Sequence, residues 1–424
     1  MELLSKLQNI QKQYGYLPQA ELKALAEECG KPLAEVIGTA SFYSFFSFTE
    51  GQDPSRIEKL HPCRRAGKLL TPSRVPWTGL EKARSAPERI IPLIEGTGLC
   101  GRGGSGFPTA VKWKTVRDAV SDIKYVVCNI DEGEPGTGKD RVLVECNPNA
   151  IIEGMAICAA AVGAQQGYIY LRGEYADLAD SLLSAIGTAP LKQFEIELCL
   201  GSGAYVCGEE TALLNSLEGL RGEPRLKPPF PGNSGLWGKP TVINNAETFA
   251  AAAYIAEHGC DSGTRLFTAS GPVKAPGVYE LPSYAVVAEV LAVAGGGIAP
   301  LTAVQLGGGS GEIVPYAEYT ERSAAVGTGA LRFFGADENL LAAVRELTEF
   351  YSGESCGVCT PCRVGLQQAA KLLRRFETGN TWPEDAEKLR ALAEQIRETA
   401  RCGLGQAAVV PILSLLNHFP EVLK

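Results

Sequence analysis

The chain has 424 residues, of which 45% are hydrophobic and 21% are charged, a length that suffices for about three domains with cores of their own. Its net charge of −8 argues against a protein that binds nucleic acid through a cationic surface. No basic stretch followed by an apolar run opens the chain, so we expect no secretory signal. The longest apolar tract, 285–304, is broken by Glu289 and Pro300 and does not predict a membrane span. Thirteen cysteines without a signal indicate reduced thiols in a cytoplasmic protein, available as metal ligands.

Residues 1–50 predict short amphipathic helices separated by turns, with Leu3, Leu4 and Leu7 on one helical face. Two short helices around a turn could form a DNA-reading helix-turn-helix. This segment, however, has four lysines, no arginine and six glutamates, a balance that repels phosphate. We therefore expect a small helical docking or packing unit. Residues 51–79 contain four prolines and little periodicity, which predicts a linker.

From residue 80 to 262, short apolar runs alternate with segments of helical periodicity. Strands are expected at 125–128, 168–171 and 194–200, and helices from Asn147-Pro148 onward, at 176–187 and at 208–218. This alternation predicts βαβ units and a parallel sheet, hence an α/β fold.

The remainder predicts two further units. Residues 263–335 switch to short β-rich runs around one helix at about 286–294, which indicates a small α+β domain. Residues 336–424 predict four helices with short connections, the first capped by Asp337 and the last covering 406–418. Such a series is typical of an antiparallel four-helix bundle.

Three cysteines, Cys356, Cys359 and Cys362, are spaced by two residues in a loop that leads into a helix N-terminus. Backbone N–H groups at such an end stabilise thiolate charge. Cys402 lies in the turn between the last two predicted helices, at the same end of the bundle, and can supply a fourth thiolate. We expect a [4Fe–4S] cluster. Structural zinc, which more often shows paired CxxC units, and plain reduced cysteines are the alternatives.

The same region contains a formal G-x-S-x-G match at Gly353, Ser355 and Gly357. A hydrolase nucleophile elbow needs a strand before the serine and a later histidine as base. Here a helix precedes the motif and only His418 follows it, so we reject hydrolase chemistry.

A glycine-rich loop at 98–109 includes a G-x-G-x-x-G match at Gly101, Gly103 and Gly106. Glycines let backbone N–H groups approach phosphate oxygens closely, and Arg102 and Lys112 could neutralise a phosphate. The loop does not follow a predicted strand, which argues against an ordinary Rossmann fingerprint.

Two polar loops follow predicted strands, at the sheet edge where α/β proteins bind ligands. The first contains Asn129, Asp131, Glu132 and Glu134, and the second runs from Gly201 to Glu210. Three acidic residues so close together could simply form a solvated surface loop. The alternative is that their oxygens accept hydrogen bonds from a flavin or a nicotinamide amide, in a crevice between the loops.

Seven motifs in order resemble the NADH-binding, 51 kDa-type flavoprotein subunit of respiratory complex I and of related NAD-linked hydrogenases and formate dehydrogenases. The resemblance covers about 80–424, through GRGGSGFPTAVKW (101–113), CNIDEGEPG (128–136), YLRGEY (170–175), GAYVCGEETALLNSLEG (203–219), KPPFP (227–231), INNAET (243–248) and ESCGVCTPCRVG (354–365). It implies a Rossmann-like FMN domain (80–262), a ubiquitin-like domain (263–335) and a four-helix bundle (336–424) with the [4Fe–4S] cluster.

The same resemblance implies roles for individual residues, grouped by the part of the bound cofactors that each would meet. Those near the FMN phosphate would be Gly101, Arg102, Gly103, Gly104 and Lys112. Those lining FMN would be Asn129, Asp131, Tyr205, Gly208, Glu209, Asn244, Asn245 and Thr248. Near the nicotinamide and its ribose would lie Glu132, Glu134 and Glu210, with Glu134 as the catalytic residue, and at the adenine end Phe107, Lys227 and Phe230. The cluster ligands would be Cys356, Cys359, Cys362 and Cys402.

Residues 15–43 resemble the helical N-terminal part of the companion 24 kDa-type subunit, which continues into a [2Fe–2S] domain. Only Cys29 and Cys63 precede Cys100, too few for that cluster. The expected activity is hydride transfer between NAD(H) and FMN, then single-electron transfer to the cluster. Expected partners are a 24 kDa-type [2Fe–2S] protein or a catalytic hydrogenase or dehydrogenase subunit. Electron bifurcation and a non-catalytic assembly role are the alternatives.

Overall fold

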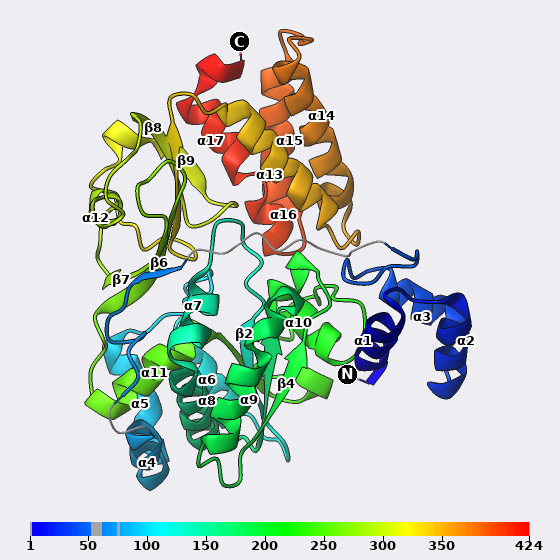
Figure 1. Ribbon diagram of the computed structural model, residues 1–424, viewed down its shortest axis with the longest axis vertical. Helices are drawn as coiled ribbons and strands as arrows, with labels where there is room; N and C mark the ends of the chain where they lie inside the picture. The colour runs from blue at the N-terminus through cyan, green and yellow to red at the C-terminus, as the bar shows by residue number, and fades with distance from the viewer. Residues whose placement is uncertain (1, 52–61, 74–76, 424) are drawn as a thin grey trace.

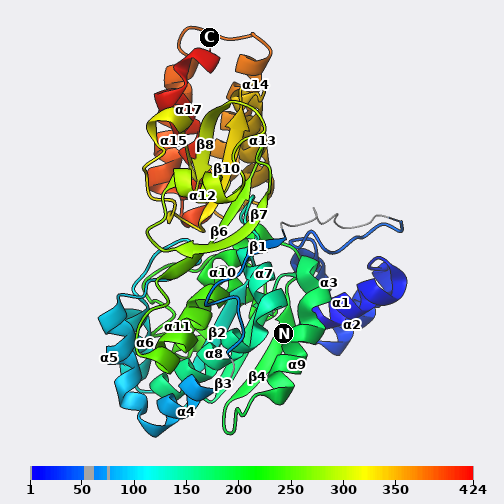
Figure 2. The same ribbon diagram turned by 60° about the vertical axis from the view of Figure 1, so that its left-hand side comes forward.

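The computed structural model describes residues 2–51, 62–73 and 77–423. In Figure 1 a parallel-sheet domain, cyan to green, occupies the lower part, with a six-stranded sheet in yellow and a helical bundle in orange and red above it. Figure 1 shows the six-stranded sheet beside the bundle, and in Figure 2, where the sheet is turned forward, both lie on top of the parallel-sheet domain with the sheet in front of the bundle. The N-terminal helices, in blue, lie to one side, next to β4 and α10.

The parallel-sheet domain has a four-stranded sheet in the order β4-β3-β2-β5, with all neighbours parallel. Its strands are β2 Tyr125–Ile130, β3 Gln166–Leu171, β4 Glu195–Leu200 and β5 Thr241–Asn245. Val126, Val127 and Cys128 are wholly buried, as expected of a strand covered on both faces. The chain moves outward from β2 through β3 to β4 and then returns to the other side of β2. The point between β2 and β5 is therefore a topological switch point.

The helices around this sheet follow the predicted alternation. They are α4 Thr78–Ser85, α5 Ile90–Thr97, α6 Thr109–Asp118, α7 Lys139–Cys146, α8 Pro148–Val162, α9 Ala179–Thr188, α10 Glu210–Leu217 and α11 Ala246–His258. Short 3₁₀ turns are η1 Pro87–Arg89, η2 Gly173–Leu178, η3 Tyr205–Gly208 and η4 Leu236–Gly238.

Helix α8 begins where Asn147-Pro148 predicted it, with the Asn147 side chain accepting from the Ala150 amide. It packs closely on α11, since a Cβ at Gly154 would lie 2.0 Å from the carbonyl oxygen of Phe249. Among the described residues no single helix is long and apolar enough to cross a membrane. Only α7 and α8 taken together, bent by 97°, meet that requirement of length and composition.

The six-stranded sheet is mixed, in the order β1-β7-β6-β10-β8-β9, and with α12 Val287–Val293 it confirms the small ubiquitin-like α+β unit. Its strands are β1 Cys63–Arg65, β6 Thr264–Ser270, β7 Gly277–Pro282, β8 Leu301–Leu306, β9 Glu312–Pro315 and β10 Ala330–Gly335, with the turn η5 Tyr316–Glu318. Strand β1 lies inside 51–79, where we expected a linker, and pairs with β7. Leu69 and Leu70 from the same range are buried, whereas 52–61 and 74–76 lie outside the described residues.

The bundle contains α13 Leu340–Gly353, a π-turn Pro361–Gly365, α14 Leu366–Glu377, α15 Asp385–Thr399, α16 Gly403–Ala407 and α17 Val410–His418, then η7 Pro420–Leu423. The predicted cap Asp337 is wrong: the side chain of Asn339 accepts from the Ala342 amide at 3.1 Å. Asn and Asp cap equally well, so composition alone could not choose between them. The helix predicted at 406–418 is two helices, and Pro411, which lacks an N–H, sits in the first turn of the second one, where a proline is tolerated.

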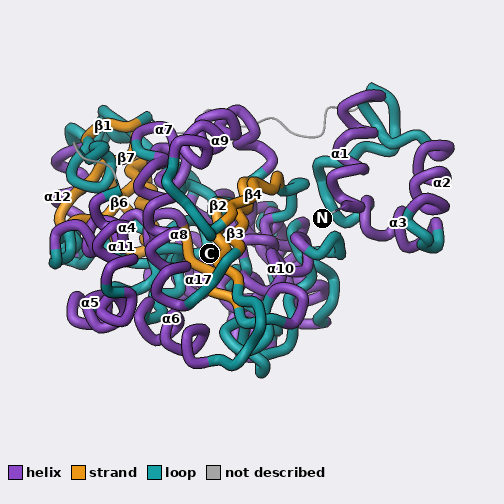
Figure 3. Tube along the Cα trace, turned by 90° about the horizontal axis from the view of Figure 1, so that it is seen from below, coloured by secondary structure: helices purple, strands orange, loops and turns teal. Residues whose placement is uncertain are grey.

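The N-terminal segment, α1 Glu2–Tyr14, α2 Gln19–Glu28 and α3 Leu33–Ala40, docks at the carboxyl end of β4. Gln8 Nε2 donates to the Leu200 carbonyl at 2.9 Å, and the Ser44 amide donates to the Gly203 carbonyl at 2.8 Å. Seen from below in Figure 3, these helices project from the side of the molecule opposite β1 and β7. They confirm the expected small helical packing unit.

Candidate functional site

A cavity of about 430 Å³ lies at the carboxyl ends of β2 and β5, at the switch point. The parallel-sheet domain, the six-stranded sheet and the bundle each contribute to its wall. Ten residues singled out from the sequence line it: Gly103, Gly104, Asn129, Asp131, Glu132, Glu134, Tyr205, Gly208, Glu209 and Asn245. The other nine residues expected to bind FMN or NAD(H) are not among its lining residues: Gly101, Arg102, Phe107, Lys112, Glu210, Lys227, Phe230, Asn244 and Thr248.

The glycine-rich loop connects α5 to α6, with no strand before it, as the sequence indicated. The Gly101 amide donates to the Phe107 carbonyl at 2.8 Å, which closes the loop. A Cβ at Gly103 would lie 3.1 Å from Asn245 Cβ, and Gly104 has φ +120°, a conformation that favours glycine. The loop therefore presents bare backbone to the cavity, which suits an approaching phosphate.

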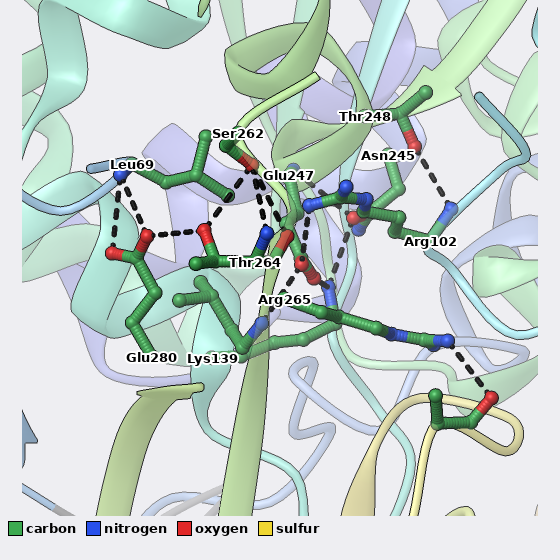
Figure 4. A network of polar contacts seen from close by, with 12 residues as sticks. Leu69, Arg102, Lys139, Asn245, Glu247, Thr248, Ser262, Thr264, Arg265 and Glu280 are labelled. Carbon is green, nitrogen blue, oxygen red and sulfur yellow. Dashed lines mark hydrogen bonds and ion pairs between the residues drawn. The ribbon is translucent and has the colours of Figure 1, made fainter. Parts of the chain in front are cut away.

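A buried charge network supports this loop from behind (Figure 4). The fully buried carboxylate of Glu247 pairs with Arg102 at 3.2 Å and with Lys139 at 3.2 Å. Burial acts to raise the pKa of Glu247, but Lys139, Arg102 and Arg265 together hold it below its usual value. Arg265 also donates to the carbonyls of Ala325 and Gly327. Glu247 thus links the glycine-rich loop through Arg102, helix α7 through Lys139 and strand β6 through Arg265.

Arg102 and Thr248 occupy supporting positions. The guanidinium of Arg102 is directed at Glu247 and, at 3.6 Å, at Asp261. The backbone amide of Arg102 donates to Thr248 Oγ1 at 2.9 Å. Their contacts hold the glycine-rich loop against the start of α11, and neither residue lines the cavity.

The acidic loop after β2 places carboxylates in the cavity wall. Asn129 Nδ2 donates to the Gly208 carbonyl at 2.9 Å, which joins this loop to the loop after β4. Asp131 Oδ2 is buried and has no hydrogen-bond partner among the residues that the structure describes, and burial raises the pKa of Asp131 to about 8. Glu132 accepts from the Asp140 amide at 2.9 Å and from Tyr175 Oη at 3.0 Å. Asp131 is thus the acid of this pair with an oxygen still available to a ligand.

Glu134 receives hydrogen bonds from all three walls of the cavity. Tyr205 Oη donates to Oε2 at 2.5 Å. The Ser310 amide and Tyr351 Oη donate to Oε1 at 2.6 and 3.2 Å. Burial, followed by the charge of Glu134, raises the pKa of both tyrosines well above its usual value, so both remain protonated donors. The carboxylate is held in one orientation.

A strip of charged and aromatic residues continues outward from Glu209. Lys227 Nζ bridges Glu209 and Glu210, each at 2.8 Å. Lys112 Nζ donates to Glu210 at 3.0 Å and lies 6.0 Å from the centre of the Phe107 ring. Phe107 and Phe230 are 48% and 55% exposed. These residues extend the cavity over the surface, whereas Asn244 is buried and accepts from Trp113 Nε1 at 2.9 Å.

The four predicted cluster cysteines lie near one another in the bundle, since the charges of Cys356, Cys359 and Cys402 all act on Cys362. Burial raises the pKa of Cys362 to about 12, with smaller contributions from the charges of Cys359, Cys402 and Cys356, whereas a hydrogen bond with Ser355 acts to lower it. Burial raises the pKa of Cys402, and the amides of Leu404 and Gly405, at the start of α16, act to lower it. In the described part of the chain no three His, Cys, Asp or Glu side chains are close enough to hold a single metal ion.

The thiols and the cavity share a wall. Gly403, Leu404 and Ala407 line the cavity, and Gly403 directly follows Cys402 in the sequence. A Cβ at Gly405 would lie 3.2 Å from Cys362 Cβ. This turn of α16 therefore packs against the loop that contains Cys356, Cys359 and Cys362, called the thiol loop below. One turn of helix thus touches both sites.

Several lining residues were missed from the sequence. Thr137 and Lys139 belong to the Gly-Thr-Gly-Lys run at 136–139, a glycine-rich signal next to the acidic loop that could have indicated them. Lys139 Nζ donates to Asn245 Oδ1 at 2.9 Å. Ser310 and Thr328 come from loops of the six-stranded sheet and carry no local signal.

Comparison with known proteins agrees with this architecture. The Nuo51 FMN-binding domain matches residues 94–254, the NADH-ubiquinone oxidoreductase-F iron-sulfur binding region matches 342–424, and the thioredoxin-like [2Fe-2S] ferredoxin family matches 1–65. The F-type subunit of NADH-quinone oxidoreductase from Aquifex aeolicus is 42% identical over 375 residues, covering 81% of this chain and 88% of the relative.

Two NAD-reducing hydrogenases are also similar. The HoxS subunit alpha of Cupriavidus necator is 42% identical over 365 residues, covering 80% of this chain but 60% of the longer relative. A chain in the crystal structure of the NAD⁺-reducing [NiFe]-hydrogenase in the H₂-reduced state superposes with a TM-score of 0.89 at 30% identity, covering 98% of this chain and 92% of that one.

The residues fit the cofactors of these matched regions. The glycine-rich loop offers bare backbone amides, Asp131 Oδ2 is a buried oxygen with no hydrogen-bond partner in the described part of the chain, and four thiols lie near one another beside the cavity. Fold and site therefore define an NADH-binding flavoprotein subunit that contains FMN and a [4Fe–4S] region and transfers electrons. The chain belongs to the family of F-type subunits of NADH-quinone oxidoreductase.

Proposed function

We propose that the cavity holds FMN with its phosphate toward the glycine-rich loop, at Gly101, Gly103, Gly104 and Lys112. Arg102 and Thr248 would hold this loop in place. Asn129, Asp131, Tyr205, Gly208, Glu209 and Asn245 would line the flavin, and Asn244 would support β5 through Trp113. When bound, FMN accepts a hydride from NADH and releases electrons singly, which a cluster that exchanges one electron at a time requires.

NADH would extend from the cavity along the outer strip. Glu132, Glu134 and Glu210 would lie near the nicotinamide and its ribose, and Phe107, Lys227 and Phe230 would receive the adenine end. The two exposed phenyl rings offer faces for stacking. Glu134, with its fixed carboxylate, would orient the nicotinamide half, because an acceptor already held in place loses little entropy on binding. The protein contributes positioning and electrostatics rather than proton transfer.

The observation that carries this proposal is the shared wall of cavity and thiols. Cys356, Cys359, Cys362 and Cys402 would ligate the cluster, and the turn of α16 that follows Cys402 lines the cavity. A cluster held there would lie directly beside the flavin. Electron transfer between the two would need no intermediate carrier in this chain.

The complex containing this chain would be a cytoplasmic NAD-linked hydrogenase or dehydrogenase assembly. The structural likeness to the NAD⁺-reducing hydrogenase covers 98% of the chain and so includes the N-terminal segment, whereas the match to the Aquifex aeolicus relative covers 81%. The partner would be a catalytic hydrogenase or dehydrogenase subunit, or a 24 kDa-type [2Fe–2S] protein. Affinity purification of the tagged chain from its host identifies it, and recovery with membrane quinone-reducing subunits alone would contradict this assignment.

An anaerobic visible spectrum before and after addition of NADH tests the core activity. We expect flavin absorbance to bleach together with the broad iron–sulfur shoulder. A reconstituted protein that binds FMN and iron but stays oxidised in NADH would support the assembly role instead. Replacing Glu134 with Gln should raise KM for NADH while leaving FMN content unchanged, and unchanged kinetics would reject its role.

A further inference from the structure

The last turn of α13 reaches across from the bundle to the acidic loop. Tyr351 is wholly buried, and its hydroxyl donates to Glu134 Oε1 at 3.2 Å. The other two donors to this carboxylate, Tyr205 Oη and the Ser310 amide, belong to the parallel-sheet domain and the six-stranded sheet. Tyr351 is the donor contributed by the part of the chain that bears the thiols.

The backbone after Tyr351 leads directly to the thiol loop. Helix α13 ends at Gly353, and Glu354 and Ser355 connect it to Cys356. Glu354 Oε2 accepts from the Tyr205 amide at 2.8 Å, and the rings of Tyr205 and Tyr351 meet edge to face, 5.5 Å apart. Tyr205 is therefore held at its hydroxyl by Glu134 and at its amide by Glu354, so the acidic loop and the thiol loop are joined through two short contacts.

We propose that Tyr351 is a positioning residue that orients Glu134 for NAD(H) and couples that carboxylate to the cluster-bearing bundle. This inference rests on the proposed function of Glu134. A carboxylate with a fixed donor on each oxygen has one favoured orientation, and hydrogen bonds to a charged group are stronger than those between neutral groups. Without the Tyr351 hydroxyl, Oε1 keeps only the backbone donor of Ser310, and the carboxylate is less firmly held.

The test is Tyr351→Phe in the flavin- and iron-loaded protein, which keeps the ring packing and removes the donor. We expect affinity for NAD⁺, measured by calorimetry, to fall about five- to tenfold, less than the full effect of a charge-assisted hydrogen bond because Tyr351 acts on the ligand only through Glu134. KM for NADH should rise by the same factor, with FMN and iron contents unchanged. Tyr279→Phe is the matched control, since this buried tyrosine donates to the Ala275 carbonyl within the six-stranded sheet. It should leave NAD⁺ affinity unchanged.

A double-mutant cycle separates positioning from general stabilisation. If Tyr351 acts through Glu134, Tyr351→Phe should change NAD⁺ affinity less than twofold once Glu134→Gln is present, because contacting residues are non-additive. Equal effects in both backgrounds would overturn the proposal. So would a lower unfolding midpoint with unchanged NAD⁺ affinity. If Glu134→Gln weakens NAD⁺ binding and Tyr351→Phe does not, this inference alone fails. If Glu134→Gln itself has no effect, the proposed role of Glu134 fails.

Discussion

Arg102 and Glu247 form a buried ion pair, with Nη1 3.2 Å from Oε1 and side chains 7% and 0% exposed. The pair joins the glycine-rich loop to the first turn of α11. Because Lys139 shares the same carboxylate, one buried anion holds both the glycine-rich loop and a lysine of the cavity wall in place.

Removing that anion should destabilise the whole domain. Glu247→Gln leaves Arg102 and Lys139 with one partner fewer in a buried site, and breaking such a pair costs about 3–5 kcal/mol. We expect a corresponding fall in the free energy of unfolding in urea. Glu384→Gln breaks an exposed pair with Lys388 and should not move the unfolding curve. An unchanged free energy of unfolding in Glu247→Gln would show that the buried charge network does not stabilise the fold.

Asp131 should make stability of the FMN-free protein depend on pH. Burial raises its pKa to about 8, above the ordinary value near 4, so the folded state binds this proton more tightly than the unfolded state. That contribution is complete below about pH 4 and is lost as pH rises through 8. In Asp131→Asn, urea unfolding between pH 5 and 9 should show a shallower decline. An identical slope would indicate that Asp131 is ionised at neutral pH.

Loss of one thiol should remove the iron–sulfur cluster and leave the flavin site intact. Cys402→Ala removes the proposed fourth ligand at the start of α16, and we expect loss of iron and acid-labile sulfide with FMN retained. NADH should still bleach the flavin, because the residues that hold it are untouched. Cys260→Ala, at an exposed cysteine, is the control and should keep its iron. Full iron in Cys402→Ala would assign the fourth ligand elsewhere.

Docking of the N-terminal segment should stabilise the loop that carries Tyr205 and Gly208. Gly203 has φ +76°, and a Cβ there would lie 2.7 Å from Ser44 Oγ and 3.1 Å from the Phe45 nitrogen. Gly203→Ala should therefore cost at least about 1 kcal/mol and lower FMN affinity, measured by fluorescence titration. Gly187→Ala in α9, with open space around it, should be neutral or stabilising by up to about 1 kcal/mol. Unchanged FMN affinity in Gly203→Ala would show that docking of the N-terminal segment does not affect FMN binding.

The sequence by itself determined the local features of this protein. Apolar runs such as 125–128 and caps such as Asn147-Pro148 predicted elements because neighbouring residues decide backbone conformation. The spacing of Cys356, Cys359 and Cys362 placed three thiols in one loop for the same reason, and their ligation of a cluster stays a prediction. Strand β5 was missed, since two of its five residues are asparagines, which are depleted in strands.

Only the tertiary structure decided which distant groups meet. It turned the guanidinium of Arg102 away from the cavity toward Glu247, and it brought Ser310 and Tyr351 to Glu134 across separations of 176 and 217 residues. Such contacts depend on how whole domains pack, so the residues next to a side chain in the sequence do not predict them. The sequence motifs therefore predict which residue types form the site. The orientation of each side chain comes from the packing of three domains around one cavity.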